Sequence, residues 1–274
     1  MEIHSWRGRA ALAEQLARDA GATLLALRRE GVEAREKAHG DLVTRADEAA
    51  EALVLGGIRA AFPDDPVVAE ESDGPEGARA RRAAIEAAPI AWCVDPLDGT
   101  TNFVRGRFDF AVSIGLLAWG RPVFGVVHAP ARRETFVGGT GVPAARIDDA
   151  SGERATIGPS SVIDPSRALV GTGYSSDVEL NAWTSTRLVR FVHEARDVRR
   201  VGGATLELCD VACGRLDAFF QRGLGPWDVA AAWAILMAAG ARVGALDGGL
   251  GSPFEAEVLA SNGRLHAALI ERLR

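Results

Sequence analysis

The stretch that most constrains the fold is WCVDPLDGTTNF, in which two aspartates directly follow an apolar segment. The apolar segment, 90–94, is typical of a buried strand. Pro96 disfavours the helical region for Asp95, so the chain leaves this strand in an extended conformation. Gly99 then permits a tight turn, which holds Asp95 and Asp98 together at the strand end. Two carboxylates this close favour a hard cation between them, although Asp-Pro and Asp-Gly turns without a metal are also common.

At three further positions, an acidic side chain or exposed backbone amides lie at the end of a predicted strand or the start of a predicted helix. Glu70 ends a short apolar segment and would, in isolation, be a solvated surface acid. Asp228 opens an apolar helix, where an aspartate is often only a helix cap. Gly202 and Gly203 precede another predicted helix, and helix N-termini bind phosphate. Taken together, these positions predict a metal cluster beside a phosphate site, which is the pair that phosphoryl transfer needs.

The remaining pattern divides the chain into two halves, about 1–150 and 151–274. In the first half, periodicity predicts helices over 8–29 and 47–62, a strand over 67–69 and an antiparallel meander over 108–139. In the second half, predicted strands (168–171, 216–220, 258–260) alternate with predicted helices (181–194, 204–213, 228–239, 264–273). We therefore expect a single domain, 1–274, of mixed α+β and α/β class. The segment 141–165 has no clear pattern.

Composition narrows the classes of function. Hydrophobic residues make up 47% and charged residues 25% of the chain, which is typical of a globular protein with an ample core. The formal net charge of −6 gives no basic footprint for nucleic acid, and no segment is apolar over the length of a membrane helix. The N-terminus lacks a signal-peptide layout, and none of the three cysteines forms a Cys-x-x-Cys motif. We expect a cytoplasmic protein without nucleic-acid or membrane partners.

Two motifs resemble the signatures of the inositol monophosphatase family of Mg²⁺-dependent phosphatases. They are WCVDPLDGTTNF and GPWDVAAAWAILMAAGARV. Supporting stretches follow the family order, namely DLVT with Asp47, EES from Glu70, and VGGATLELCDVACGRLDAFF. The resemblance runs from about Leu12 to the C-terminus. It implies a layered α-β-α-β-α sandwich, usually a homodimer, and in many members inhibition by lithium.

The resemblance also implies a role for each matched residue. The Mg²⁺ ligands would be Glu70, Asp95, the carbonyl of Leu97, Asp98 and Asp228. The catalytic residues would be Asp98 together with Thr100 and Glu70, which would position and deprotonate the attacking water. The substrate, a small phosphate ester, would be held by Gly99, Thr100, Gly202, Gly203, Ala204, Gln221 and Asp228. A mobile loop that closes on the site would contain Lys37, Asp41 and Thr44.

One position departs from the family pattern. Inositol-selective members carry a glutamate shortly before the Trp-Asp motif, and here that position is Gln221. The leading hypothesis is a phosphomonoesterase that uses metal-activated water on inositol monophosphate or a similar polyol phosphate. Fructose-1,6-bisphosphatase, histidinol-phosphate phosphatase and nucleotide 3′-phosphatase are alternatives with the same chemistry. The alternative that is not an enzyme is a regulatory binding module on the same fold. The retention of every metal ligand and of Thr100 favours an enzyme.

Overall fold

The computed structural model describes residues 6–36, 42–175 and 177–274. Its α-helices are α1 (Arg7–Glu30), α2 (Arg45–Ala61), α3 (Glu70–Ala87), α4 (Thr100–Val104), α5 (Val178–Glu194), α6 (Ala204–Ala212), α7 (Pro226–Ala239) and α8 (His266–Leu273). A seven-stranded sheet has the spatial order β3 (Val67–Ala69), β4 (Ala91–Asp98), β5 (Ala111–Ala118), β6 (Arg121–Ala129), β7 (Glu134–Gly139), β8 (Val142–Asp148) and β9 (Arg154–Thr156). A five-stranded sheet has the order β11 (Asp197–Arg199), β10 (Leu169–Thr172), β12 (Ala218–Arg222), β14 (Glu257–Ser261) and β13 (Arg242–Gly244). A separate antiparallel pair consists of β1 (Ala34–Glu36) and β2 (Leu42–Thr44).

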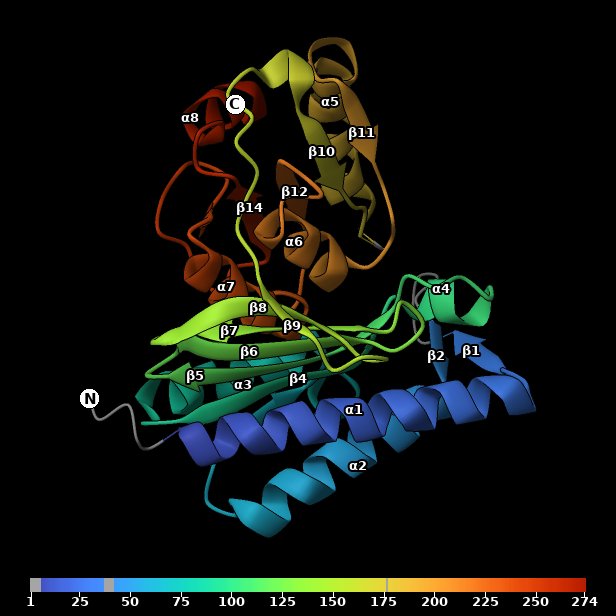
Figure 1. The fold of residues 1–274 in the computed structure, drawn as a ribbon. Coiled ribbons are helices and arrows are strands. Elements are labelled where there is room, and N and C mark those ends of the chain that lie inside the picture. Colours follow the sequence, from blue (N-terminus) through green and yellow to red (C-terminus); the bar gives the residue numbers. More distant parts are fainter. Residues whose placement is uncertain (1–5, 37–41, 176) are drawn as a thin grey trace.

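Helices and sheets alternate in layers (Figure 1). α1 and α2 cover one face of the seven-stranded sheet, α6 and α7 lie between the two sheets, and α5 and α8 cover the outer face of the five-stranded sheet. Each interface has its own buried apolar cluster. Phe124 lies beneath α1 and Trp92 beneath α2, Ile235 lies between the sheets, and Phe191 of α5 stacks on Phe220 of β12. This layered arrangement confirms the predicted fold class.

α7 is apolar on every side because it is enclosed between two sheets. A glycine in the facing strand allows close contact, since a Cβ at Gly125 would lie 2.0 Å from the carbonyl oxygen of Ala231. The hydroxyl of Ser113 in β5 donates to the carbonyl of Trp227 at 3.1 Å. Because Ser113 pairs with Asp95 across β4 and β5, this contact places the first turn of α7 beside Asp95.

Most predicted elements are present, with bounds shifted by a few residues. The predicted helices correspond to α1, α2, α5, α6, α7 and α8, and the meander corresponds to β5, β6 and β7. Two differences concern the candidate site. The predicted strand ends at Val94, whereas β4 continues to Asp98, and α3, which starts at Glu70, was not predicted. Gly74, at φ +61°, and Pro75 interrupt α3, and both residue types disfavour a helix interior, so the sequence signal was weak.

The segment 141–165, for which no element was predicted, contains β8 and β9, which extend the seven-stranded sheet in antiparallel register. β9 is fully exposed, so its sequence carries no apolar alternation. The chain then passes through a 3₁₀ turn at Pro165–Arg167 into β10 of the second sheet. The description as one domain with two halves stays a prediction. No described helix combines the length and apolar character needed to cross a bilayer.

Candidate metal centre

Three aspartates converge where β4 ends and α7 begins. One carboxylate oxygen from each of Asp95, Asp98 and Asp228 lies within 4.8 Å of the others. Asp95 and Asp98 are buried, and Asp228 is half-buried. A ligand set made of oxygen atoms alone suits a hard divalent cation such as Mg²⁺. The structure therefore brings together three of the residues for which the sequence predicted a metal-binding role.

An irregularity in β4 allows Asp95 and Asp98 to meet. Residues three positions apart in a regular strand point to opposite faces of the sheet. The register between β4 and β5 shifts between Asp95 and Asp98, in the segment that contains Pro96. After this shift, the backbone N–H of Leu97 donates to Asp95 Oδ1 at 2.9 Å and fixes that carboxylate. The Asp-Pro sequence thus has a local structural reason as well as a chemical one.

Two helix N-termini hold the other carboxylates. Asp98 Oδ2 accepts a hydrogen bond from the backbone N–H of Thr205 in the first turn of α6, at 2.9 Å. Asp228 Oδ2 accepts one from the N–H of Gly225 at 2.6 Å, which caps α7. The hydroxyl of Thr205 also donates to the backbone carbonyl of Asp228 at 2.8 Å. Thr205 therefore links the two helix ends and fixes the spacing of the two aspartates.

Burial and mutual repulsion make this cluster electrostatically costly. Burial is the largest cause that raises the pKa of Asp95, followed by the charges of Glu70, Asp98 and Asp228. Burial also raises the pKa of Asp98 to about 6, against the amides of α6, which lower it. Asp95 Oδ2 is buried and has no hydrogen-bond partner among the described residues. An orphaned oxygen within a group of like charges fits a cation that would pair with it.

Glu70 lies next to the three aspartates but outside the group that meets within 4.8 Å. It is the first residue of α3, and its charge is the second cause of the raised pKa of Asp95. The buried carboxylate of Glu51 on α2 holds this end of α3, because it accepts hydrogen bonds from the N–H of Glu71 at 2.8 Å and from the hydroxyl of Ser72. α3 therefore presents Glu70 from a fixed helix start.

The hydroxyl of Thr100 faces a carboxylate that the sequence analysis did not assign to the site. Thr100 Oγ1 lies 3.1 Å from Asp47 Oδ1 and 3.1 Å from the carbonyl oxygen of Leu97, and its one proton can be donated to either. Asp47 is buried, and burial raises its pKa. Its other oxygen accepts from the N–H and the hydroxyl of Thr44. The signal in the sequence was the pattern Thr44-x-x-Asp47, which marks only a helix start.

The predicted phosphate site at the start of α6 is tightly packed. A Cβ at Gly203 would lie 3.1 Å from Asp98 Oδ2, and a Cβ at Gly99, whose φ is +88°, would lie 2.8 Å from the carbonyl oxygen of Asp109. The amide of Gly202 donates to Glu207 Oε2 at 3.4 Å, as does that of Val201 at 3.2 Å. Burial raises the pKa of Glu207 to about 8, and its Oε1 has no partner among the described residues.

These contacts change which amides can face a phosphate. The amide of Gly202 is directed to Glu207, and the amides of Ala204, Thr205 and Leu206 are directed to Asp98, whose pKa they lower. Phosphate binding by Gly203 and Ala204 stays a prediction, and Gly202 shapes the turn into α6 at φ +90°.

Gln221 lies near the end of β12, seven positions before Asp228. Its buried side chain packs against the backbone of Gly173, where a Cβ would lie 1.9 Å from Gln221 Oε1. The contact shows that the Gly173 loop after β10 and the end of β12 form one wall.

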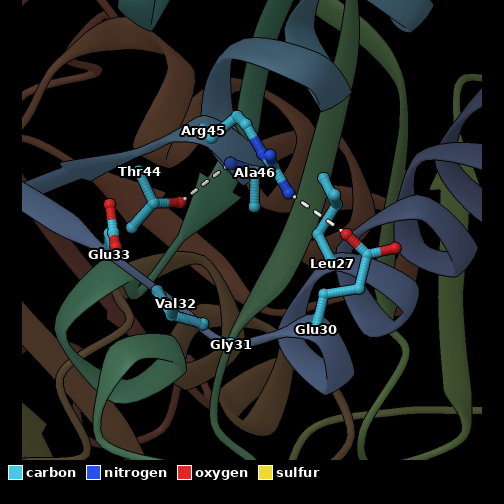
Figure 2. Close-up of a pocket in the computed structure, with 8 residues that line it drawn as sticks. All are labelled: Leu27, Glu30, Gly31, Val32, Glu33, Thr44, Arg45 and Ala46. Carbon is cyan, nitrogen blue, oxygen red and sulfur yellow. Dashed lines mark hydrogen bonds and ion pairs between the residues drawn. The ribbon is translucent and has the colours of Figure 1, made fainter.

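The predicted mobile loop falls partly outside the described residues. Lys37 and Asp41 are not among them, whereas Thr44 is, at the end of β2. Figure 2 shows a cavity of about 420 Å³ next to Thr44, between the end of α1 and the start of α2. On its wall, Arg45 Nη2 pairs with Glu30 Oε2 at 3.1 Å. None of the three aspartates lines it, and its wall is formed by the end of α1, the segment 31–33 and the start of α2.

The sequence matches the inositol monophosphatase family over residues 6–274. The chain belongs to this family. An inositol-1-monophosphatase from Synechocystis is 37% identical over 259 residues, which cover 93% of this chain and 84% of that protein. The Nus factor SuhB of Escherichia coli is 35% identical over 246 residues, which cover 89% of this chain and 87% of that protein.

Solved structures of the family share the fold. The IMPase of Thermotoga maritima has a TM-score of 0.83 at 30% identity, with 97% of this chain and 96% of that chain covered. An inositol monophosphatase from Anabaena has a TM-score of 0.79 at 33% identity, with 97% and 95% covered. The family is one of metal-dependent phosphatases, and the acidic cluster at the end of β4 agrees with that activity.

Proposed function

We propose that the protein is a Mg²⁺-dependent phosphomonoesterase that hydrolyses inositol monophosphate or a similar polyol phosphate. The observation that carries the proposal is the buried group of Asp95, Asp98 and Asp228 beside the N-terminus of α6. It offers oxygen ligands for a cation and helix-terminal amides for a phosphate in one place. The relative named inositol-1-monophosphatase supports the choice of substrate. A cytoplasmic location, a homodimer and inhibition by lithium belong to the same proposal.

The three aspartates would hold the cation, together with Glu70 and the carbonyl of Leu97. When bound, a divalent cation offsets the charge of the phosphoryl group and lowers the pKa of water. The orphaned Oδ2 of Asp95 provides a ligand atom that no described group occupies. The positive end of α6, with the amide of Gly203, would face the phosphate oxygens.

Thr100 and Asp47 would handle the proton of the attacking water. The hydroxyl of Thr100 accepts a hydrogen bond from the water and donates its own proton to Asp47 Oδ1, 3.1 Å away. As the water oxygen attacks phosphorus, its proton passes to Thr100 Oγ1 and the Thr100 proton passes to Asp47. The bond between phosphorus and the ester oxygen breaks in the same step, and the departing alkoxide takes a proton from solvent water. Burial raises the pKa of Asp47, which makes this carboxylate a better proton acceptor. Glu70 is the second group placed to orient the water.

The test is phosphate release from inositol 1-phosphate by protein treated with EDTA, before and after Mg²⁺ is added. We expect no turnover without Mg²⁺ and a loss of at least about a hundredfold in Asp98→Asn, because metal charge stabilisation is worth several kcal/mol. Asp19→Asn, an exposed aspartate on α1, is the matched control. Fructose 1,6-bisphosphate, histidinol phosphate and adenosine 3′,5′-bisphosphate test the alternative substrates. Turnover that survives exhaustive chelation would contradict the proposal.

A non-catalytic binding role is the second candidate, because a relative at 35% identity is named a Nus factor. A complementation experiment distinguishes the catalytic role from the binding role. In a strain that lacks the protein, Asp98→Asn should fail to restore growth if the role is catalytic and should restore it if the role is binding alone.

A further inference from the structure

Three neighbouring strands of the second sheet are parallel, so the residues at their carboxyl ends lie at the same end of the sheet. β11, β10 and β12 are neighbours and run parallel, with Arg199 opposite Gly171 and Thr172 opposite Phe220. Arg200 follows β11, Tyr174 follows β10, and Gln221 lies in β12 just after its pairing with β10. Ligands bind at the carboxyl ends of such strands. In Figure 1 this end of the sheet points toward α4, which follows the carboxylates of β4.

Arg200 lies between this end of the sheet and the start of α6. Its guanidinium carbon is 5.5 Å from the centre of the Tyr174 ring, which is within the range of a cation–π contact. Its Nη1 would be 3.9 Å from a Cβ placed on Gly202, the residue that leads into α6. None of the described carboxylates pairs with Arg200, whereas its neighbour Arg199 pairs with Asp197 at 2.6 Å. Arg200 is therefore held by an aromatic ring beside the turn into α6, without a carboxylate partner among the residues that the structure describes.

The charges around this wall favour a particular substrate. Gln221, packed on Gly173, is neutral where a carboxylate would repel an anion. A guanidinium gives its largest gain with an oxyanion, to which it donates two charge-assisted hydrogen bonds, and a smaller gain with a neutral hydroxyl. Beyond the phosphate held at the start of α6, a polyol monophosphate would offer Arg200 only hydroxyls.

We propose that the substrate carries a second anionic group, a phosphate or a carboxylate, and that Arg200, held on Tyr174, binds it. This inference rests on the proposed phosphatase chemistry and changes its substrate, because inositol monophosphate carries no second anionic group. Arg200 would thus determine specificity, while the aspartates and Thr100 carry out the same hydrolysis on every ester.

Two matched pairs of esters test the proposal and separate the two anions. Fructose 1,6-bisphosphate differs from fructose 1-phosphate by the second phosphate, and 6-phosphogluconate differs from glucitol 6-phosphate by a carboxylate. We expect a higher kcat/KM for the doubly anionic member of at least one pair. The pair that shows the preference identifies the anion. The preference should weaken as ionic strength rises, because Arg200 is exposed and its charge is screened.

Arg200→Gln should lower kcat/KM for the preferred, doubly anionic ester by about 10- to 100-fold and leave the singly anionic ester within about twofold. Tyr174→Leu should show part of this loss, and Tyr174→Phe, which keeps the ring, should not. Arg196→Gln is the matched control, because it removes an exposed charge at the other end of β11.

An equal fall for all four esters in Arg200→Gln, or no change in any, would overturn the inference. Absence of turnover of all four esters by the wild-type protein would instead contradict the proposed function. The inference would then be tested by equilibrium binding of fructose 1,6-bisphosphate to wild-type protein and Arg200→Gln, and equal affinities would overturn it.

Discussion

Asp98→Asn should stabilise the cation-free protein while it abolishes turnover. Burial raises the pKa of Asp98 from 3.8 to about 6, so its ionised form is disfavoured in the folded state. A shift of about two units corresponds to about 3 kcal/mol at neutral pH. Asparagine keeps an oxygen that can accept from Thr205 and removes one of the charges that repel Asp95. We expect the variant to gain up to about 3 kcal/mol in free energy of unfolding.

The pH dependence follows from the same shift. A carboxyl whose folded-state pKa is raised contributes stability that is fully present below pH 3.8 and is lost as pH rises through about 6. The cation-free wild-type protein should therefore be less stable at pH 7.5 than at pH 5 on account of this group. In Asp98→Asn that part of the decrease should be absent, and the two unfolding curves should converge toward acid pH.

The assay is thermal or urea unfolding in EDTA and in saturating Mg²⁺, at pH 5 and pH 7.5. For a chain of this size, about 3 kcal/mol corresponds to a rise of roughly 6–12 °C in Tm. Mg²⁺ should raise the Tm of the wild-type protein by mass action and should have little effect on the variant. Asp19→Asn should behave as wild type in both conditions. A lower Tm of Asp98→Asn in EDTA would show that the carboxylates do not destabilise the fold, and the reasoning would fail.

Other substitutions test the remaining parts of the site. Thr100→Ala should lower kcat by about 10²–10⁴-fold with an unchanged circular dichroism spectrum, whereas Thr100→Ser, which keeps the hydroxyl, should retain most activity. Gln221→Glu should raise kcat/KM for inositol 1-phosphate by about tenfold and leave glycerol 2-phosphate unchanged; equal changes on both esters would place polyol selectivity elsewhere. Glu207→Leu should raise KM and the inhibition constant of inorganic phosphate, because two amides lose their acceptor, and Glu207→Gln should restore both. Burial lowers the pKa of His128 from 6.5 to about 4, so its stability contribution is present above pH 6.5 and is lost as pH falls toward 4; urea unfolding of His128→Gln should lack this part of the acid-side decrease.

The layers of the fold could be predicted where one face of an element is buried. α1 and α2 cover a sheet, so their sequences show helical periodicity, and β5 to β7 show strands separated by turns. β9 is exposed, and α3 is interrupted at Gly74, so neither left a periodic pattern in the sequence. The fold class was therefore predictable, although a part of each half was not.

The site residues that could be predicted are those whose contacts are local in the sequence. Asp95 and Asp98 belong to one short turn, so their proximity followed from local backbone rules. Asp228 lies far along the chain, and its convergence with them was predicted from its position at a helix start together with the other acids, and was then implied by the family resemblance. Asp47 was missed as a site residue because its contact with Thr100 spans 53 positions, while its local pattern indicated only a helix cap.

The structure assigns the geometry of the centre to more than the motif residues. Thr205 donates its N–H to Asp98 and its hydroxyl to the backbone of Asp228, so one residue of α6 positions two of the three aspartates. Asp98 in turn caps the first turn of α6. Because both anchoring contacts come from Thr205, a shift of α6 would move the supports of Asp98 and Asp228 together, and the spacing of these two carboxylates depends on this one helix end.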